Sequence, residues 1–155
     1  MKAELKVFLD TSVLFAAVHS EAGGARLLLK LGEAGAISLW VGPWVMQEAE
    51  QVLDRKSPKS KPLFALLLDR AGVQVGGKPD GSVVRQACSL IGYLPDAQVV
   101  AEALRLGVDY LVSFDRAHLV GNPRMGEQPF PIGTPGDFLK WYRGWLGQRE
   151  TRRWG

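Results

Sequence analysis

Two short apolar runs in this chain end in the same way, and this repetition constrains the fold more than any other feature. Residues 5–9 and 110–114 have the β-branched and aromatic character of buried strands, and an aspartate, Asp10 or Asp115, directly follows each run. Along the rest of the chain, strand-like and helix-like segments alternate, which is typical of βαβ units. The sequence therefore predicts an α/β fold with a mainly parallel sheet.

Glycine, proline and the spacing of apolar residues place the individual elements. Strands are expected at residues 5–9, 37–41, 73–75, 110–114 and about 130–132, and helices at residues 12–18, 22–33, 44–53, 63–71, 82–91, 96–106 and 135 to about 145. A basic loop is expected at residues 55–61, and one turn of helix near residues 117–119. Neither a Pro-, Gly- or Ser-rich linker nor a repeat divides the 155 residues, of which 46% are hydrophobic. We expect one domain at residues 1–146 and a basic tail at residues 147–155.

Cysteine content and charge limit the cellular locations and the partners expected for this chain. Cys88 is the only cysteine, so a disulfide framework is excluded and a reducing, cytoplasmic location is expected. The first residues show no signal-peptide pattern, and no apolar run approaches the roughly 20 residues of a membrane helix. The formal net charge is +3 and the sequence pI about 9.2. This charge is compatible with a polyanionic partner but does not require one.

Two further carboxylates are placed where this fold would bring them near Asp10 and Asp115. Asp96 stands at the start of a long apolar helix, and Glu48 lies on the helix after the second strand, the expected neighbour of the first strand. Open α/β sheets bind ligands outside the carboxyl ends of their strands, and carboxylates there predict a divalent-metal site. The hydroxyl groups available to orient these acids belong to Thr11, Ser12 and Ser113.

Each acid also has a purely structural explanation. Aspartate is a common helix N-cap, worth about 0.5–2 kcal/mol, and capping alone would account for Asp10, Asp96 and Asp115. Glu48 would then be one solvated position on a helix with several Glu and Gln neighbours. Capping does not, however, predict a carboxylate on the helix after the second strand. The combination therefore favours a shared site.

Four segments resemble the motif blocks of the PIN-domain ribonucleases, which include the VapC-like toxins of toxin–antitoxin systems: residues 7–14, 47–53, 95–101 and 110–119. Residues 132–139 are similar to the segment that ends many of these proteins. Each block is short, but the ordered set spans most of the chain. The resemblance implies a three-layer α/β/α fold with a central sheet of about five parallel strands.

The family's acidic site, carried onto this sequence, implies four catalytic and metal-binding residues: Asp10, Glu48, Asp96 and Asp115. The resemblance implies Ser12 and Ser113 as supporting polar groups, at positions where the family often has Asn and Thr. Both substitutions keep a short polar side chain, so the site is expected to persist with altered hydrogen bonds around the acids.

Charge repulsion among the acids predicts the chemistry of this site. Four carboxylates within a few ångströms cannot all stay ionised at low dielectric, so at least one pKa should be raised when no metal is bound. Mg²⁺ or Mn²⁺ would resolve the conflict, because both prefer oxygen ligands and the expected ligand set contains neither Cys nor His. Asp10 and Asp115 are expected to bind metal most directly, with Asp96 and Glu48 completing a second position. A metal-activated water would then hydrolyse a phosphodiester bond. The resemblance implies RNA as substrate, with an antitoxin protein and a second copy of the chain as partners.

Basic residues outside the acidic cluster are candidates for RNA contact. Arg116 follows the last acid, and the other candidates lie in the basic loop: Arg55, Lys56, Lys59 and Lys61. Ordinary solvated surface charge is the alternative for each of them. The aromatic residues between positions 141 and 145 could stack bases, but core or dimer packing is the alternative. His118 could carry protons, with a hydrogen-bonding or surface role as its alternative.

Other protein classes also place acids at strand ends. An aspartyl-phosphate enzyme usually needs a second Asp two residues after its nucleophile, where this chain has Ser12. A receiver domain needs a Lys at the end of its last strand, and none follows Ile132 directly. A catalytically silent PIN-fold module that binds RNA or protein is the stronger rival. Metal-dependent cleavage that is lost in Asp10→Asn would separate a nuclease from such a module.

Overall fold

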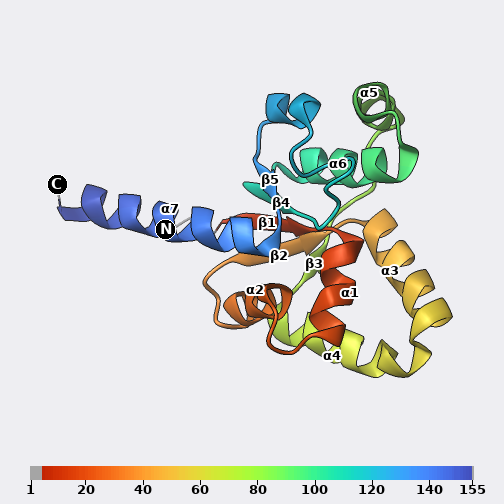
Figure 1. Ribbon diagram of the computed structural model, residues 1–155, viewed down its shortest axis with the longest axis horizontal. Coiled ribbons are helices and arrows are strands. Elements are labelled where there is room, and N and C mark those ends of the chain that lie inside the picture. The colour runs from red at the N-terminus through yellow and green to blue at the C-terminus, as the bar shows by residue number, and fades with distance from the viewer. Residues whose placement is uncertain (1–4, 155) are drawn as a thin grey trace.

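Five parallel strands form one sheet at the centre of the molecule (Figure 1). The computed structural model describes residues 5–154, and the side chains of residues 5–150. The strand order is β3-β2-β1-β4-β5, and every neighbouring pair is parallel. The strands are β1 (Lys6–Leu9), β2 (Ser38–Val41), β3 (Gln74–Val75), β4 (Tyr110–Val112) and β5 (Ile132–Gly133). The α/β class and the five-stranded parallel sheet predicted for this chain are confirmed.

Helices cover both faces of the sheet and produce the three expected layers. In Figure 1, α5 and α6 lie on one side of the sheet, whereas α1, α2 and α4 lie on the other. The helices are α1 (Thr11–His19), α2 (Gly24–Glu33), α3 (Pro43–Lys56), α4 (Lys61–Ala71), α5 (Gly81–Ile91), α6 (Leu94–Leu106) and α7 (Pro135–Trp154), with the 3₁₀ helices η1 (Pro58–Ser60) and η2 (Pro123–Glu127). Within residues 5–154, none of these helices combines the length and apolar character that a membrane crossing requires.

The two central strands are buried on both faces, which explains their apolar sequences. Val7, Phe8 and Leu9 of β1 have no exposed surface, and the same holds for Leu111 and Val112 of β4. Parallel strands covered by helices on both sides lose the alternation of apolar and polar residues that marks a half-exposed strand. The strands pair directly, with Leu9 opposite Val112. This rigid centre fixes the residues that follow β1 and β4 next to each other.

The basic segment at residues 55–61 is not the loop that the sequence suggested. Helix α3 continues to Lys56, η1 follows, and α4 begins at Lys61. Basic side chains in the last turn of α3 interact favourably with the negative end of the helix dipole, which favours a longer helix. Pro58 and Pro62 occupy first-turn positions, where a missing N–H donor costs nothing. The turn of helix expected near residues 117–119 is a hydrogen-bonded turn at residues 116–121 instead. Apart from these two segments, η2 and the end of α7, the expected boundaries agree with the structure to within two residues.

Helix α7 extends away from the body of the protein and continues to Trp154 rather than to about residue 145 (Figure 1). Its first half packs against α2, β4 and β5. The rings of Phe138, Tyr142 and Trp145 stack in sequence with centroids 5.6 and 5.8 Å apart, and the Arg149 guanidinium lies 4.7 Å from the Trp145 ring. These contacts join residues three or four positions apart, which stabilises a helix across its interior glycines. Residues 147–154 of the tail expected at residues 147–155 therefore continue the helix, and residue 155 lies outside the described residues.

Candidate active site

A cleft of about 460 Å³ opens at the carboxyl ends of the strands, where the order of the sheet reverses between β1 and β4. Such a switch point is the usual ligand site of an open parallel sheet. All four acids predicted from the sequence line this cleft: Asp10, Glu48, Asp96 and Asp115. They come from four parts of the chain, namely the ends of β1 and β4 and the helices α3 and α6. The topology therefore brings together residues that are more than a hundred positions apart.

Asp10 is the buried centre of a hydrogen-bond cluster. Its carboxylate caps α1 by accepting the Thr11 N–H at 2.7 Å, and it also accepts the hydroxyls of Ser113 at 2.7 Å and Ser12 at 3.2 Å. Burial raises the pKa of Asp10, the three hydrogen bonds counteract this, and the charge of Asp115 adds a further rise. Capping is thus one function of Asp10, but its second oxygen faces the hydroxyls and the neighbouring acid.

Two serine hydroxyls join the end of β1 to the end of β4. Ser113 donates to Asp10 and accepts the Asp115 N–H at 3.0 Å. Ser12 donates to Asp10 and accepts the Phe114 N–H at 3.1 Å. Each hydroxyl uses both its donor and its acceptor capacity, which fixes the orientation of the carboxylate. The sequence predicted these two positions as supporting polar groups, and the structure places both beside Asp10.

Asp96 and Asp115 share one end of the cleft with a histidine. His118 Nδ1 lies 3.1 Å from Asp96 Oδ2 and 3.3 Å from Asp115 Oδ2. Burial, followed by the charge of Asp115, raises the pKa of Asp96 to about 7. Burial would also raise the pKa of Asp115, but the His118 backbone N–H, the proton on Asp96 and the His118 side chain together lower it. The pair thus holds one proton, chiefly on Asp96, as predicted for a cluster without metal.

Helix capping accounts for these two acids unequally. Asp115 accepts the N–H groups of Ala117 and His118, each at 3.0 Å, and so holds the turn after β4. Asp96 lies in the first turn of α6, whose N-cap residue is Tyr93. Its Oδ2 has no hydrogen-bond partner with suitable geometry among the described residues, although it is buried. Capping therefore does not explain Asp96.

Glu48 reaches the cleft from α3, and a second glutamate fixes that helix. Burial raises the pKa of Glu48, and the charge of Asp10 contributes to the rise. Glu102 of α6 is almost fully buried and accepts the N–H groups of Trp44 at 2.8 Å and Val45 at 3.2 Å, at the start of α3. The carboxylate takes the place of a side-chain N-cap, and a β-carbon at Gly42 would overlap it. Glu102 was not among the residues predicted from the sequence.

The donor set fits a hard divalent cation. One potential ligand atom each from Asp96, Asp115 and His118 lies within 4.8 Å of the other two. Asp96 Oδ2 is buried and accepts no hydrogen bond of suitable geometry from the described part of the chain, although His118 Nδ1 lies 3.1 Å away, and a cation would satisfy it. The sequence suggested a site without histidine. The turn that follows Asp115 instead brings the His118 imidazole into the cluster, and this nitrogen widens the range of metals that the site could accept.

The predicted RNA-contacting residues do not all lie at the cleft. Lys56 lines it, with Nζ 5.8 Å from the Phe15 ring centroid. Arg55 is close enough for its charge to lower the pKa of Glu48. Arg116 is not among the residues that line the cleft. Its charge instead helps to lower the pKa of Asp137, at the start of α7. Two further candidates lie beyond the lining, the exposed Lys59 of η1 and Lys61, which pairs with Asp54 at 2.7 Å.

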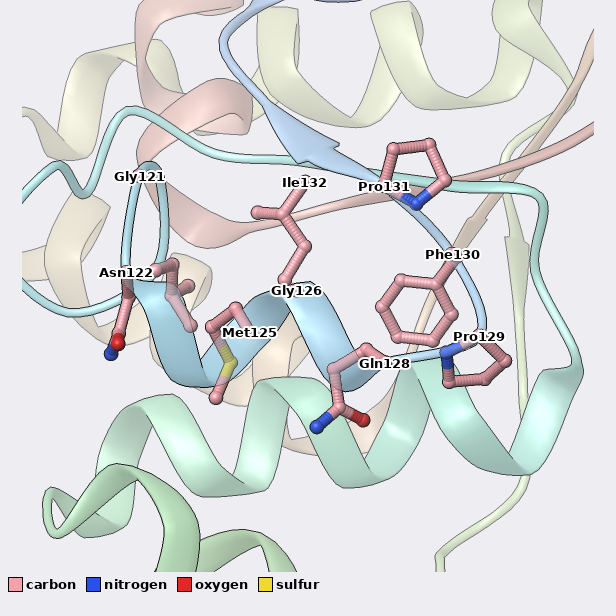
Figure 2. Close-up of a pocket in the computed structure, with 10 residues that line it drawn as sticks. Gly121, Asn122, Met125, Gly126, Gln128, Pro129, Phe130, Pro131 and Ile132 are labelled. Atoms are coloured by element: carbon pink, nitrogen blue, oxygen red, sulfur yellow. The ribbon is translucent and has the colours of Figure 1, made fainter.

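A second hollow, of about 550 Å³, lies between η2 and β5 (Figure 2). Its lining includes Met125, Phe130 and Ile132, and the polar side chains that line it are the amides of Asn122 and Gln128. No carboxylate, imidazole or thiol is among its lining residues. The hollow therefore lacks the groups that acid–base or metal chemistry needs, and the acidic cleft is the candidate active site.

Solved structures with a similar fold come from proteins with little sequence similarity to this chain. No protein-family model and no curated protein sequence matches it. VapC20 from Mycobacterium tuberculosis, described as a sarcin–ricin-loop-cleaving toxin, is 18% identical with a TM-score of 0.52, over 72% of this chain and 91% of that one. A chain of VapBC2 from Rickettsia felis, solved bound to a DNA fragment from their promoter, is 13% identical with a TM-score of 0.63, over 83% and 98%.

A third similar structure is PAE2754 from Pyrobaculum aerophilum, which is 16% identical with a TM-score of 0.55 and covers 88% of each chain. Identities this low establish a shared fold rather than a shared activity. The protein therefore has a PIN/VapC-like fold, as the order of its sequence motifs predicted.

Proposed function

We propose that this protein is a metal-dependent endoribonuclease with the biological role of a VapC-like toxin. The observation that carries the proposal is the convergence of four carboxylates, from four elements, on one cleft of a PIN/VapC-like fold. The similar VapC20 is a toxin that cleaves the sarcin–ricin loop, which supports RNA as the substrate.

The chain's own residues would bind the cation and accept the proton that Asp96 releases. Asp10 and Asp115 would hold it most directly, with Asp96 and Glu48 completing the site. A bound Mg²⁺ or Mn²⁺ would supply a more acidic water and would neutralise charge on the phosphate. Asp96 holds a proton near neutral pH, and that proton must leave before the carboxylate can act as a ligand. His118 Nδ1, 3.1 Å away, is positioned to accept it.

Partners and location follow from the same proposal. The similar VapBC2 structure is bound to DNA from its own promoter, which supports an antitoxin protein as a partner for this chain. An RNA-cleaving toxin would meet both its substrate and its antitoxin in the cytoplasm. The homodimer expected from the resemblance is retained as part of the proposal.

Cleavage of an RNA panel by the purified protein in EDTA, Mg²⁺ or Mn²⁺ tests the proposal. We expect cleavage only with metal, and its loss in Asp10→Asn and Asp115→Asn. Asp69→Asn, which alters an exposed carboxylate on α4, is the matched control and should cleave like the parent protein. Metal-independent cleavage, or full activity in Asp10→Asn, would contradict the proposal. RNA binding without turnover under every condition would favour the silent binding module.

A further inference from the structure

Aromatic side chains line the acidic cleft together with the carboxylates. The four rings belong to Phe15, Trp44, Tyr93 and Phe114. Two of them are exposed, since Tyr93 retains 46% and Phe114 44% of its accessible surface. Large apolar side chains gathered at a functional cleft commonly mark the surface that a ligand covers. The exposed rings therefore indicate a ligand that has apolar faces.

Both exposed rings are held beside the acids. Phe114 directly precedes Asp115, and its backbone N–H donates to Ser12 at 3.1 Å. Tyr93 stands three positions before Asp96 and stacks on His118, with ring centroids 4.6 Å apart and planes inclined by 19°. Any group that rests on these rings would thus lie next to the reacting centre.

The chemistry of the lining favours single-stranded nucleic acid over a duplex. Planar rings stack on the face of any unpaired base, and cationic side chains attract the phosphate backbone. Lys56 supplies such a cation at the cleft, beside the Phe15 ring. In a duplex the base faces are already stacked on one another, so the rings would gain nothing from it.

We propose that Tyr93 and Phe114 stack on unpaired bases beside the scissile phosphate, and so determine how tightly this cleft holds unpaired RNA. The proposal rests on the proposed function only in placing RNA in this cleft. Tyr93 also supports His118, so Phe114 gives the cleaner test.

Binding measured without turnover tests the stacking directly. The affinity of a short, fluorescently labelled, unpaired oligoribonucleotide is measured by anisotropy, with Ca²⁺ replacing Mg²⁺ to allow binding without cleavage. The variants are Phe114→Ala and Phe114→Trp, with Val75→Ala as the matched control. Val75 lies on β3 outside the cleft lining and is 53% exposed, so this control truncates an apolar side chain of comparable exposure away from the cleft. Thermal melting of each variant verifies that it is folded.

We expect Phe114→Ala to weaken binding about 5- to 150-fold, which is the range for losing one base–aromatic stack. Phe114→Trp should bind at least as well as the parent protein, and Val75→Ala should be unchanged. An abasic oligonucleotide of the same length should bind the parent protein and Phe114→Ala equally. Equal affinity of Phe114→Ala and Val75→Ala for unpaired RNA would overturn the proposal. Equal affinity of the parent protein for the unpaired and the abasic oligonucleotide would overturn it too.

The two proposals fail in different ways. Metal-dependent cleavage combined with ring-independent binding would refute stacking and leave the nuclease intact. Ring-dependent binding without any cleavage would refute the nuclease and leave stacking intact. A peptide that competes for the cleft, when RNA binding does not depend on the ring, would assign the aromatic surface to a protein partner.

Discussion

Replacing Asp96 with Asn should stabilise the metal-free protein at alkaline pH. The folded protein holds a proton on Asp96, because burial and the charge of Asp115 raise the pKa of this carboxyl from 3.8 to about 7. Unfolding returns the pKa to its ordinary value. Between these two values the folded state binds more protons than the unfolded state, so stability falls as pH rises and levels off above about pH 7.

The size of the effect follows from the shift. A change from 3.8 to about 7 corresponds to about 4 kcal/mol, at ~1.4 kcal/mol per pKa unit. Only the part of this titration above about pH 5 falls between about pH 5 and about pH 8, so we expect about 3 kcal/mol over that range. The pKa of Asp115 is lowered, because the effect of its burial is outweighed by the His118 backbone N–H and the proton on Asp96, so Asp115 is ionised in both states over this range and does not change the slope. For a chain of this size about 3 kcal/mol corresponds to roughly 6–12 °C in melting temperature.

Urea unfolding in EDTA across this pH range measures the effect. The parent protein should lose stability as pH rises, whereas Asp96→Asn should lose much less and should exceed the parent at the alkaline end. Asp69→Asn, at an exposed site on α4, should follow the parent at every pH. Added Mg²⁺ should stabilise the parent more than Asp96→Asn, since the variant lacks a ligand. An Asp96→Asn protein that is less stable than the parent at alkaline pH would refute the reasoning.

Three further substitutions test the contacts around the cleft. Glu102→Leu leaves two N–H groups at the start of α3 without their acceptor, one buried and one partly buried, and should cost about 2–4 kcal/mol in urea unfolding, unlike an exposed Glu→Leu control. Ser113→Ala removes a hydroxyl that donates to Asp10 at 2.7 Å; Mn²⁺ affinity by calorimetry should fall about 10- to 100-fold, and an unchanged affinity would mean that this hydroxyl does not orient the site. Gly133→Ala places a methyl group against the Tyr110 hydroxyl and should lower the free energy of unfolding by about 1–3 kcal/mol. An unchanged melting temperature would show that the end of β5 shifts to make room for the methyl group.

Local sequence was sufficient for the elements and for the acids at strand ends. Apolar runs without alternation identified β1 and β4, and Asp10 and Asp115 follow them because a parallel sheet aligns its carboxyl ends. Glu48 was predicted only because α3 follows β2, the neighbour of β1. The family resemblance implied Ser12 and Ser113 as supporting polar groups, and the structure adds that both hydroxyls donate to Asp10.

Tertiary packing decided what the sequence did not reveal. His118 enters the site because the turn after β4 folds back on Asp115, and its spacing of three residues from that acid was the available signal. Glu102 stands among apolar residues on the buried face of α6, a position that indicates a buried partner without identifying it. The extension of α7 depends on aromatic rings and a guanidinium that stack along the helix. The glycines of this segment favour an earlier helix end, and they do not reveal these contacts.

Diffraction from crystals soaked in Mn²⁺, recorded to give an anomalous difference map, tests the shared metal site most directly. We expect a Mn²⁺ peak in the cleft within coordination distance of Asp115 and at least one of Asp10 and Asp96, and its loss in Asp115→Asn crystals. A fully soaked crystal without a peak there, or with Mn²⁺ bound only elsewhere, would contradict the claim that these carboxylates form a metal centre.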